Sequence, residues 1–359
     1  MRDLVIFIPS IEGGGVEKNL FYITNFLKKK FKNIFLITAH KLDKNLFGND
    51  IKLITPSSKF YNDKSRLIKS LICSILLFRN FKNKNILIFS FQSNFFSTLI
   101  AKIINSKLII RLNTSPEKYS YPFHKKFLFR ILYGFADEII VNSYEFKKNI
   151  MNYFNLKSIV ILNPIKINYK KKKINFFKNF YGLKIITIGR LSHQKDHITL
   201  LKALNLLRNI YKVNFKFYLI GRGYNRAMLL NYISSNNLQK NIKLAGYKKN
   251  ASDYINSADL FVLSSKYEGL PNTLIEAQAA GLPIISSNCP SGPKEILMNG
   301  KLGDLYKSGD HKSLCKKINN YYRNKKILNK KSMLAKKYMY RFDYQKNLEK
   351  YSIILKKYI

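Results

Sequence analysis

Two glutamates at the start of a predicted helix form the part of this sequence best suited to chemistry. Glu268 and Glu276 lie eight residues apart, with a glycine and a proline between them. Pro271 fits the first turn of a helix, because an N–H group there would have no helical partner. Gly281 fits the position just past the helix end. We therefore expect a helix over about Pro271–Ala280, with one carboxylate before it and one within it.

The start of this helix is suited to a ligand that is both a polyol and an anion. The first N–H groups of a helix lack internal partners and attract phosphate, and carboxylates accept hydrogen bonds from sugar hydroxyls. Glu268, the helix start and Glu276 could therefore meet the sugar, the diphosphate and the ribose of a nucleotide-sugar, in that order. The alternative is two solvated acids, but the flanking apolar strands and prolines favour ligand binding.

This stretch resembles the donor-binding motif of retaining glycosyltransferases of the GT-B fold. That family includes sucrose synthases, mannosyltransferases and bacterial surface-polysaccharide enzymes, and in it the first Glu contacts the donor sugar and the second the nucleotide ribose. The resemblance implies these roles for Glu268 and Glu276. It also implies donor contacts for the residues between them, which are Gly269, Leu270, Pro271, Asn272 and Thr273.

Two cations follow the predicted strand Lys184–Ile188. They are Arg190 and Lys195, and paired cations can neutralise a departing nucleoside diphosphate. Surface cations are the alternative. The G-R-L sequence with a Lys five residues after the Arg is similar to the diphosphate-binding segment of the family. The resemblance implies catalytic roles for Arg190 and Lys195 and a donor contact for Gly189.

Three further segments follow predicted strands. Gly13, Gly14 and Gly15 form a turn that lets a ligand approach the backbone closely, and the family has a glycine loop here. Gly246, Tyr247 and Lys248 match the segment where the family holds the nucleobase. Arg111 and Asn113 stand where some members have a His that touches the donor sugar, and Arg111 either faces the ligand or caps its strand. These two residues are candidate contacts on the acceptor or sugar side.

The loop Cys289–Ile296 resembles that of enzymes that build bacterial surface polysaccharides and lipid-linked oligosaccharides. Many of those use UDP-sugars, which implies a UDP-hexose or UDP-N-acetylhexosamine donor. The acceptor implied is a polyprenyl-diphosphate-linked glycan. No D-x-D, nucleophile motif or zinc-type His/Cys cluster occurs, so we expect no cofactor and no metal.

Short apolar runs alternate with helical patterns along the chain, which predicts parallel sheets covered on both faces. The fold class expected is α/β, specifically GT-B, with two doubly wound Rossmann-like domains facing a cleft. The expected parts are an acceptor-side domain (1–165), a linker (166–182), a nucleotide-sugar domain (183–340) and a terminal helix (341–359). In the resembled family, that helix packs back on the first domain.

The composition of the chain bears on its cellular compartment and on its binding partners. The chain of 359 residues has 64 Lys and Arg against 20 Asp and Glu, a net charge of +44. This excess suits an anionic membrane surface, on which Lys64–Arg79 and Lys118–Arg130 could rest, or nucleic acid; biased genome composition explains it equally well. Three unpaired cysteines fit a reducing compartment. We expect a cytoplasmic protein, with peripheral contact to the inner face of the cell membrane.

The function predicted is a retaining, metal-independent glycosyltransferase that acts in surface polysaccharide or glycoconjugate biosynthesis. A nucleotide-sugar epimerase or a phosphorylase of the same fold is one alternative. A basic nucleic-acid-binding protein is the alternative from another class, but no nucleic-acid motif supports it, and nucleic acid is not an expected partner.

Overall fold

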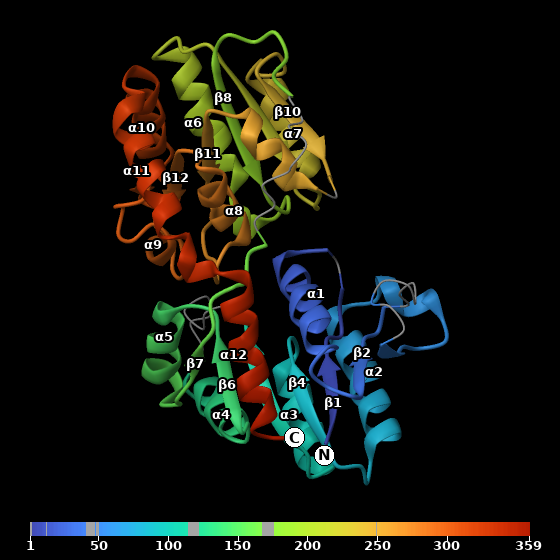
Figure 1. The fold of residues 1–359 in the computed structure, drawn as a ribbon. Coiled ribbons are helices and arrows are strands. Elements are labelled where there is room, and N and C mark those ends of the chain that lie inside the picture. Colours follow the sequence, from blue (N-terminus) through green and yellow to red (C-terminus); the bar gives the residue numbers. More distant parts are fainter. Residues whose placement is uncertain are drawn as a thin grey trace. The chain divides into compact units, whose positions relative to one another are not determined.

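The protein divides into two compact α/β units, each with its own parallel sheet (Figure 1). The first unit is Met1–Pro164 with Tyr344–Ile359, and the second is Ile165–Asp343. This computed structural model describes residues 2–11, 13–40, 47, 50–113, 122–166, 176–248 and 250–359. The predicted linker (166–182) includes residues 167–175, which lie outside the described residues.

The first unit has a sheet of strand order β3-β2-β1-β4-β5-β6-β7, and every pairing described in it is parallel. Its strands are β1 (Asp3–Phe7), β2 (Ile34–Ile37), β3 (Ile51–Ile54), β4 (Ile86–Ser90), β5 (Lys107–Leu112), β6 (Glu138–Val141) and β7 (Ile159–Val160). Its α-helices are α1 (Gly15–Leu27), α2 (Arg66–Phe81), α3 (Asn94–Ile103), α4 (Phe123–Gly134), α5 (Tyr144–Phe154) and α12 (Tyr344–Lys356).

Both faces of the first sheet are covered, because its strands are apolar on both sides. On one face, Leu4 and Ile6 of β1 pack with α1 and with Leu348 and Tyr351 of α12. On the other face, Val5 of β1 packs in a cluster that includes side chains of α2 and α5. The terminal helix α12 thus belongs to the first unit, although the second unit separates it from the rest in the sequence.

The second unit has strand order β10-β9-β8-β11-β12-β13, again with parallel pairing throughout the residues described. Its strands are β8 (Leu183–Ile188), β9 (Phe215–Ile220), β10 (Ile242–Gly246), β11 (Leu260–Leu263), β12 (Ile284–Ser287) and β13 (Asp304–Tyr306). Its α-helices are α6 (His197–Asn209), α7 (Arg226–Ser235), α8 (Asn272–Ala280), α9 (Pro293–Ile296), α10 (His311–Arg323) and α11 (Lys325–Lys337).

Each unit is therefore a doubly wound, Rossmann-like domain, as the sequence predicts. In such sheets, ligands bind outside the carboxyl ends of the strands, where the strand order reverses. In the second unit this point lies between β8 and β11, and in the first unit between β1 and β4. Among the described residues, no helix combines the length and apolar character needed to cross a membrane.

Candidate active site

The reversal point of the second sheet brings together two of the predicted catalytic residues. Lys195 follows β8, and Glu268 follows β11, which is the neighbouring strand. Lys195 Nζ lies 2.6 Å from Glu268 Oε1, in an ion pair whose side chains are only 14% and 6% exposed. The same Oε1 accepts a hydrogen bond of 2.5 Å from Ser265 Oγ. Two residues that are 73 positions apart therefore form one charged pair at the carboxyl edge of the sheet.

The two loops that carry this pair are joined by hydrogen bonds on either side of it. The Lys266 N–H donates to the Gln194 carbonyl at 2.8 Å, and Gln194 Nε2 donates to the Tyr267 carbonyl at 3.0 Å. Ser264 Oγ donates to the Lys195 carbonyl at 2.9 Å. These bonds fix the backbone of both loops, so the ammonium and the carboxylate are held in place before any ligand arrives.

Gly292 supports the turn that follows Glu268. A Cβ atom on Gly292 would lie 2.0 Å from the Gly269 carbonyl oxygen and 2.9 Å from Pro271 Cδ. Gly292 also has a φ of +89°, a conformation that side chains rarely adopt. The loop after β12 therefore packs directly against the start of α8, and only glycine allows this approach.

We expect Gly292→Ala to lower the free energy of unfolding by about 2–4 kcal/mol, because the methyl group must displace backbone. Urea unfolding measures the change. Gly309→Ala is the matched control, since Gly309 has a φ of +80° but a Cβ there would meet no atom within 4 Å. The control should cost only the backbone strain, about 1–2 kcal/mol. Equal losses in the two variants would contradict the proposed contact.

Helix α8 begins one residue later than the sequence indicates, at Asn272. Pro271 is its N-cap and supplies no capping side chain. Thr273 Oγ1 is buried and has no hydrogen-bond partner within the described part of the chain. Glu276 lies half-buried inside the helix. The start of α8 carries the positive end of the helix dipole, which favours an anionic ligand.

Gly189 lies next to the pair from the side of β8, and Arg190 follows it in the chain. The Arg190 side chain is exposed. The backbone carbonyl oxygen of Arg190 lies 3.2 Å from His197 Nε2. A Cβ on Gly189 would lie 3.5 Å from the aliphatic stem of Lys195. The pKa of His197 is lowered to about 4, mainly by burial; the bond to the Arg190 carbonyl opposes this shift, and nearby Lys195 adds to it. A neutral His197 therefore holds the loop that carries both cations.

This pKa predicts acid sensitivity. Between about pH 6.5 and pH 4, the unfolded chain binds a proton at His197 while the folded chain does not. The unfolded state therefore binds more protons, and the free energy of unfolding falls as the pH falls. We expect a loss of about 3 kcal/mol from this group. Urea unfolding at several pH values should show it, with a smaller loss in His197→Gln; an unchanged pH profile in that variant would contradict the assignment.

The predicted nucleobase segment lies at the edge strand of the same sheet. Gly246 ends β10 with a φ of +70°, and a Cβ there would meet no atom within 4 Å. The ring of Tyr247 is half exposed and lies under the Arg222 guanidinium at 5.1 Å. Lys248 follows it, and its side chain is partly exposed. Open space beside Gly246 and an exposed ring are compatible with a flat base.

The glycine loop of the first unit is less suited to phosphate than the sequence indicates. Gly13 has a φ of +80°, and Gly15 begins α1. The Gly14 N–H, however, donates to Glu17 Oε2 at 2.9 Å. A carboxylate thus already occupies the start of α1, and it would repel an anion.

Arg111 neither faces a ligand nor caps its strand, which were the two interpretations of the sequence. It lies within β5, and its side chain is fully buried. Its Nε donates to the Tyr351 hydroxyl of α12 at 2.9 Å, and one terminal nitrogen donates to Asn163 Oδ1 at 2.9 Å. The other donates to Asn113, whose Nδ2 donates to the Phe91 carbonyl. Arg111 therefore fastens α12 to the sheet, and neither it nor Asn113 is assigned to the acceptor side.

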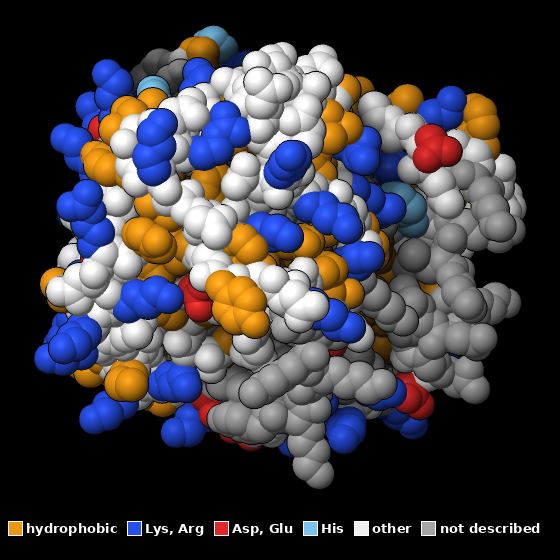
Figure 2. All heavy atoms as spheres, turned by 90° about the horizontal axis from the view of Figure 1, so that it is seen from above, with side chains coloured by type: hydrophobic (Ala, Val, Ile, Leu, Met, Phe, Trp, Pro, Cys, Tyr) orange, Lys and Arg blue, Asp and Glu red, His pale blue; other side chains and the backbone are white. Residues whose placement is uncertain are grey.

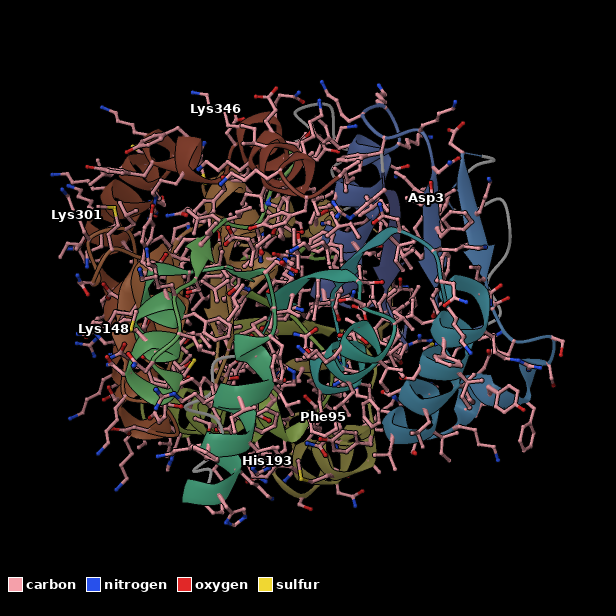
Figure 3. All side chains as sticks on the ribbon, turned by 90° about the horizontal axis from the view of Figure 1, so that it is seen from below. Asp3, Phe95, Lys148, His193, Lys301 and Lys346 are labelled. Carbon is pink, nitrogen blue, oxygen red and sulfur yellow. The ribbon has the colours of Figure 1, made fainter. Side chains whose placement is uncertain are left out.

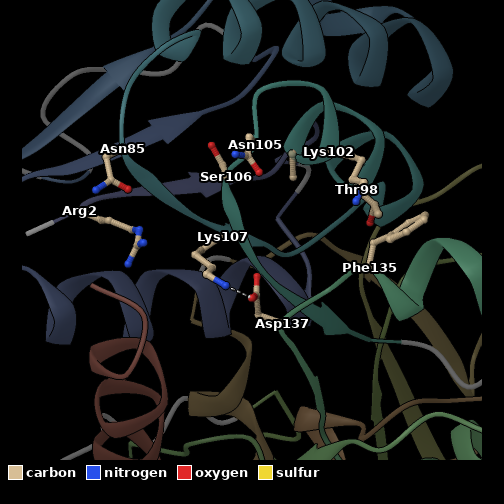
Figure 4. Close-up of a pocket in the computed structure, with 10 residues that line it drawn as sticks. Arg2, Asn85, Thr98, Lys102, Asn105, Ser106, Lys107, Phe135 and Asp137 are labelled. Atoms are coloured by element: carbon tan, nitrogen blue, oxygen red, sulfur yellow. Dashed lines mark hydrogen bonds and ion pairs between the residues drawn. The ribbon is translucent and has the colours of Figure 1, made fainter.

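A polar pocket of about 360 Å³ lies at the opposite, amino-terminal edge of the first sheet (Figure 4). Arg2, Asn85 and Lys107 contribute to its lining. The Lys107 ammonium is already paired with Asp137 at 2.7 Å, and ligands of doubly wound sheets bind at the other edge. We therefore do not assign the donor to this pocket. Within the described ranges, no group of three or more His, Cys, Asp or Glu residues is arranged to hold a metal ion.

Two further residues, which the sequence motifs do not identify, shape the site. Ser265 donates to Glu268, and Gln194 joins the two loops. Ser265 lies directly after β11, three residues before Glu268, and Gln194 lies between Arg190 and Lys195. Their position after the carboxyl end of a strand could have marked both residues as candidates. That position does not indicate which way a side chain points.

Comparisons with known proteins agree with this geometry. Residues 170–339 match the family described as "Glycosyl transferases group 1". An uncharacterized glycosyltransferase of Methanocaldococcus jannaschii is 34% identical over 54% of this chain and 51% of its own length, so the match spans about half of that relative. The N-acetylgalactosamine-N,N'-diacetylbacillosaminyl-diphospho-undecaprenol 4-alpha-N-acetylgalactosaminyltransferase of Campylobacter jejuni is 25% identical over 88% of each chain.

Solved structures share the fold over the whole chain. The structure of Anabaena HepE with UDP and glucose has a TM-score of 0.82 at 18% identity, and the similarity covers 99% of this chain and 100% of that one. At this identity the similarity shows the fold. Together, these similarities show the GT-B fold, and residues 170–339 carry the match to the glycosyltransferase family.

Proposed function

We propose that the protein is a retaining, metal-independent glycosyltransferase. It moves a hexose or N-acetylhexosamine from a UDP-sugar to a polyprenyl-diphosphate-linked glycan. The observation that carries the proposal is the buried Lys195–Glu268 pair at the reversal point of the second sheet. The UDP-bound Anabaena structures and the Campylobacter relative, which is named for a diphospho-undecaprenol substrate, support the choice of donor and acceptor.

In this proposal, each side chain has one task. The Glu268 carboxylate accepts hydrogen bonds from the donor sugar and orients it, while Glu276 binds the ribose. Lys195, Arg190 and the start of α8 neutralise the diphosphate as it leaves. Lys195 is held by Glu268 in an ion pair. A donor bound at this pair would therefore place its sugar beside Glu268 and its diphosphate beside Lys195.

The bond changes balance without a protein nucleophile. The acceptor hydroxyl oxygen forms a bond to the anomeric carbon on the face that the diphosphate leaves. The bond between that carbon and the diphosphate oxygen breaks, and the hydroxyl proton passes to the departing diphosphate. The configuration at the anomeric carbon is retained. This route requires positioning and charge stabilisation from the protein.

Product stereochemistry tests the proposal. The full chain would be incubated in EDTA with UDP-glucose, UDP-galactose or their N-acetylated forms, and with a short-chain polyprenyl-diphosphate disaccharide. NMR of the new anomeric proton would then give the configuration. An α-linked product from one α-linked donor is expected. A β-linked product, a requirement for added metal, or release of free sugar alone would contradict the proposal.

A further inference from the structure

Three neighbouring helices of the first unit form one continuous layer. Helix α2 contacts α3, and α3 contacts α4. Figure 3 shows them beside one another, with α2 in blue, α3 in teal and α4 in green. Cys73 and Leu77 of α2 and Ala101 of α3 point toward the sheet and are buried in its core. The outer sides of these helices consequently form a surface of the unit.

That surface carries several exposed apolar side chains. Leu67, Leu71 and Ile75 are 62%, 46% and 55% exposed, and their spacing of four residues places them in one stripe along α2. Ile103 of α3 is 66% exposed. A stripe of exposed residues also runs along and just past α4, comprising Phe127, Ile131 and Phe135. Exposed apolar side chains gathered on neighbouring helices mark an interaction site. We call these seven residues the docking face.

Biased composition does not explain the docking face. Helix α10 of the second unit belongs to the same Lys-rich chain, yet it buries Leu314 and Ile318 and exposes Lys312 and Lys316. Lys and Arg side chains are likewise spread over the face shown in Figure 2. Helix α11 exposes Ile327 and Met333 six residues apart and so not in one stripe, whereas α2 exposes three apolar side chains at a spacing of four residues.

The charge of the three helices indicates the partner. Helices α2, α3 and α4 contain seven Lys or Arg residues and no Asp or Glu. A second copy of this chain would place like charges opposite one another, which is unfavourable. An anionic lipid surface fits both features, because apolar side chains enter the acyl boundary while cations meet the phosphate groups.

We propose that the docking face binds the surface of an anionic lipid bilayer. This inference stands on the first unit alone and does not depend on donor binding in the second. It corresponds to the two basic segments noted in the sequence, of which residues 118–121 lie outside the described residues.

Vesicle flotation with the full chain tests it. Wild-type protein should float with phosphatidylcholine vesicles that contain phosphatidylglycerol and stay in solution with pure phosphatidylcholine. Leu71→Glu/Ile75→Glu should lower the partition coefficient more than about tenfold. The matched control is Ile327→Glu/Met333→Glu on α11, which replaces side chains that are 61% and 70% exposed and adds the same charge. The control should bind like the wild type.

Three results would overturn the inference. They are equal losses in the two variants, unchanged binding in Leu71→Glu/Ile75→Glu, and equal binding of the wild type to both kinds of vesicle. The substituted side chains are exposed, so thermal unfolding should show that both variants fold. UDP binding in solution, measured on the same variants, should stay at the wild-type level. That readout separates failure of the docking face from failure of the donor site.

Discussion

Glu268→Gln is expected to lower the rate of sugar transfer roughly 10²–10³-fold, with little change in UDP affinity. The carboxylate accepts bonds from Lys195 and Ser265 and is 6% exposed. In the proposed mechanism it orients the donor sugar, which UDP lacks. An amide of the same shape removes the charge and one acceptor site but leaves the diphosphate contacts intact. The loss should therefore appear in kcat rather than in the dissociation constant of UDP.

Two other glutamates make this result specific. Glu276→Gln should weaken UDP binding, because its proposed partner is the ribose. Glu349→Gln on α12 alters an exposed carboxylate that contacts Gln345, and it should leave both quantities unchanged. Steady-state kinetics and calorimetry with UDP measure the three variants. Full activity in Glu268→Gln, or a loss that appears only in UDP affinity, would contradict the role given to Glu268.

Lys195→Met is expected to lower both transfer and stability. The methionine fills the space of the lysine stem but provides no cation for the departing diphosphate, so kcat should fall roughly 10²–10³-fold. It also leaves the Glu268 carboxylate buried without its ionic partner. Removing one member of a buried pair costs about 3–5 kcal/mol. Kinetics and urea unfolding measure the two effects separately, with Lys243→Met in the exposed part of β10 as the control.

The double variant Lys195→Met/Glu268→Gln distinguishes a catalytic role from a structural one. It contains no unpaired buried charge, so its unfolding free energy should return toward the wild-type value. Its activity should remain as low as that of the single variants. Recovery of activity along with stability would mean that Lys195 only supports the fold.

The sequence predicted the sheets well, because long apolar strands followed by amphipathic helices have few alternative arrangements. It missed β3, β7 and β13, which are four, two and three residues long. The two and three residues of β7 and β13 are too few to show a periodicity, and Lys52 interrupts the apolar run of β3. Their place at the sheet edges is set by tertiary pairing.

The candidate site was predicted only in part for a similar reason. Motifs at strand ends identified Glu268 and Lys195 because parallel strands bring their carboxyl ends to one edge. The sequence did not show that these two side chains pair with each other. It gave no indication that Arg111 would bond to Tyr351, a residue 240 positions away. Side-chain direction depends on packing between distant segments, which local patterns do not contain.

Donor binding without metal tests the central claim most directly. Thermal unfolding would be followed in EDTA with UDP-, GDP- and ADP-sugars, for the wild type and for Glu276→Ala. At a donor concentration about 100 times Kd, binding adds about 2.7 kcal/mol to the stability of the folded state. We predict a rise in midpoint with UDP-sugars that disappears in Glu276→Ala. No rise with any donor, or an equal rise in the variant, would contradict a donor site at the carboxyl edge of the second sheet.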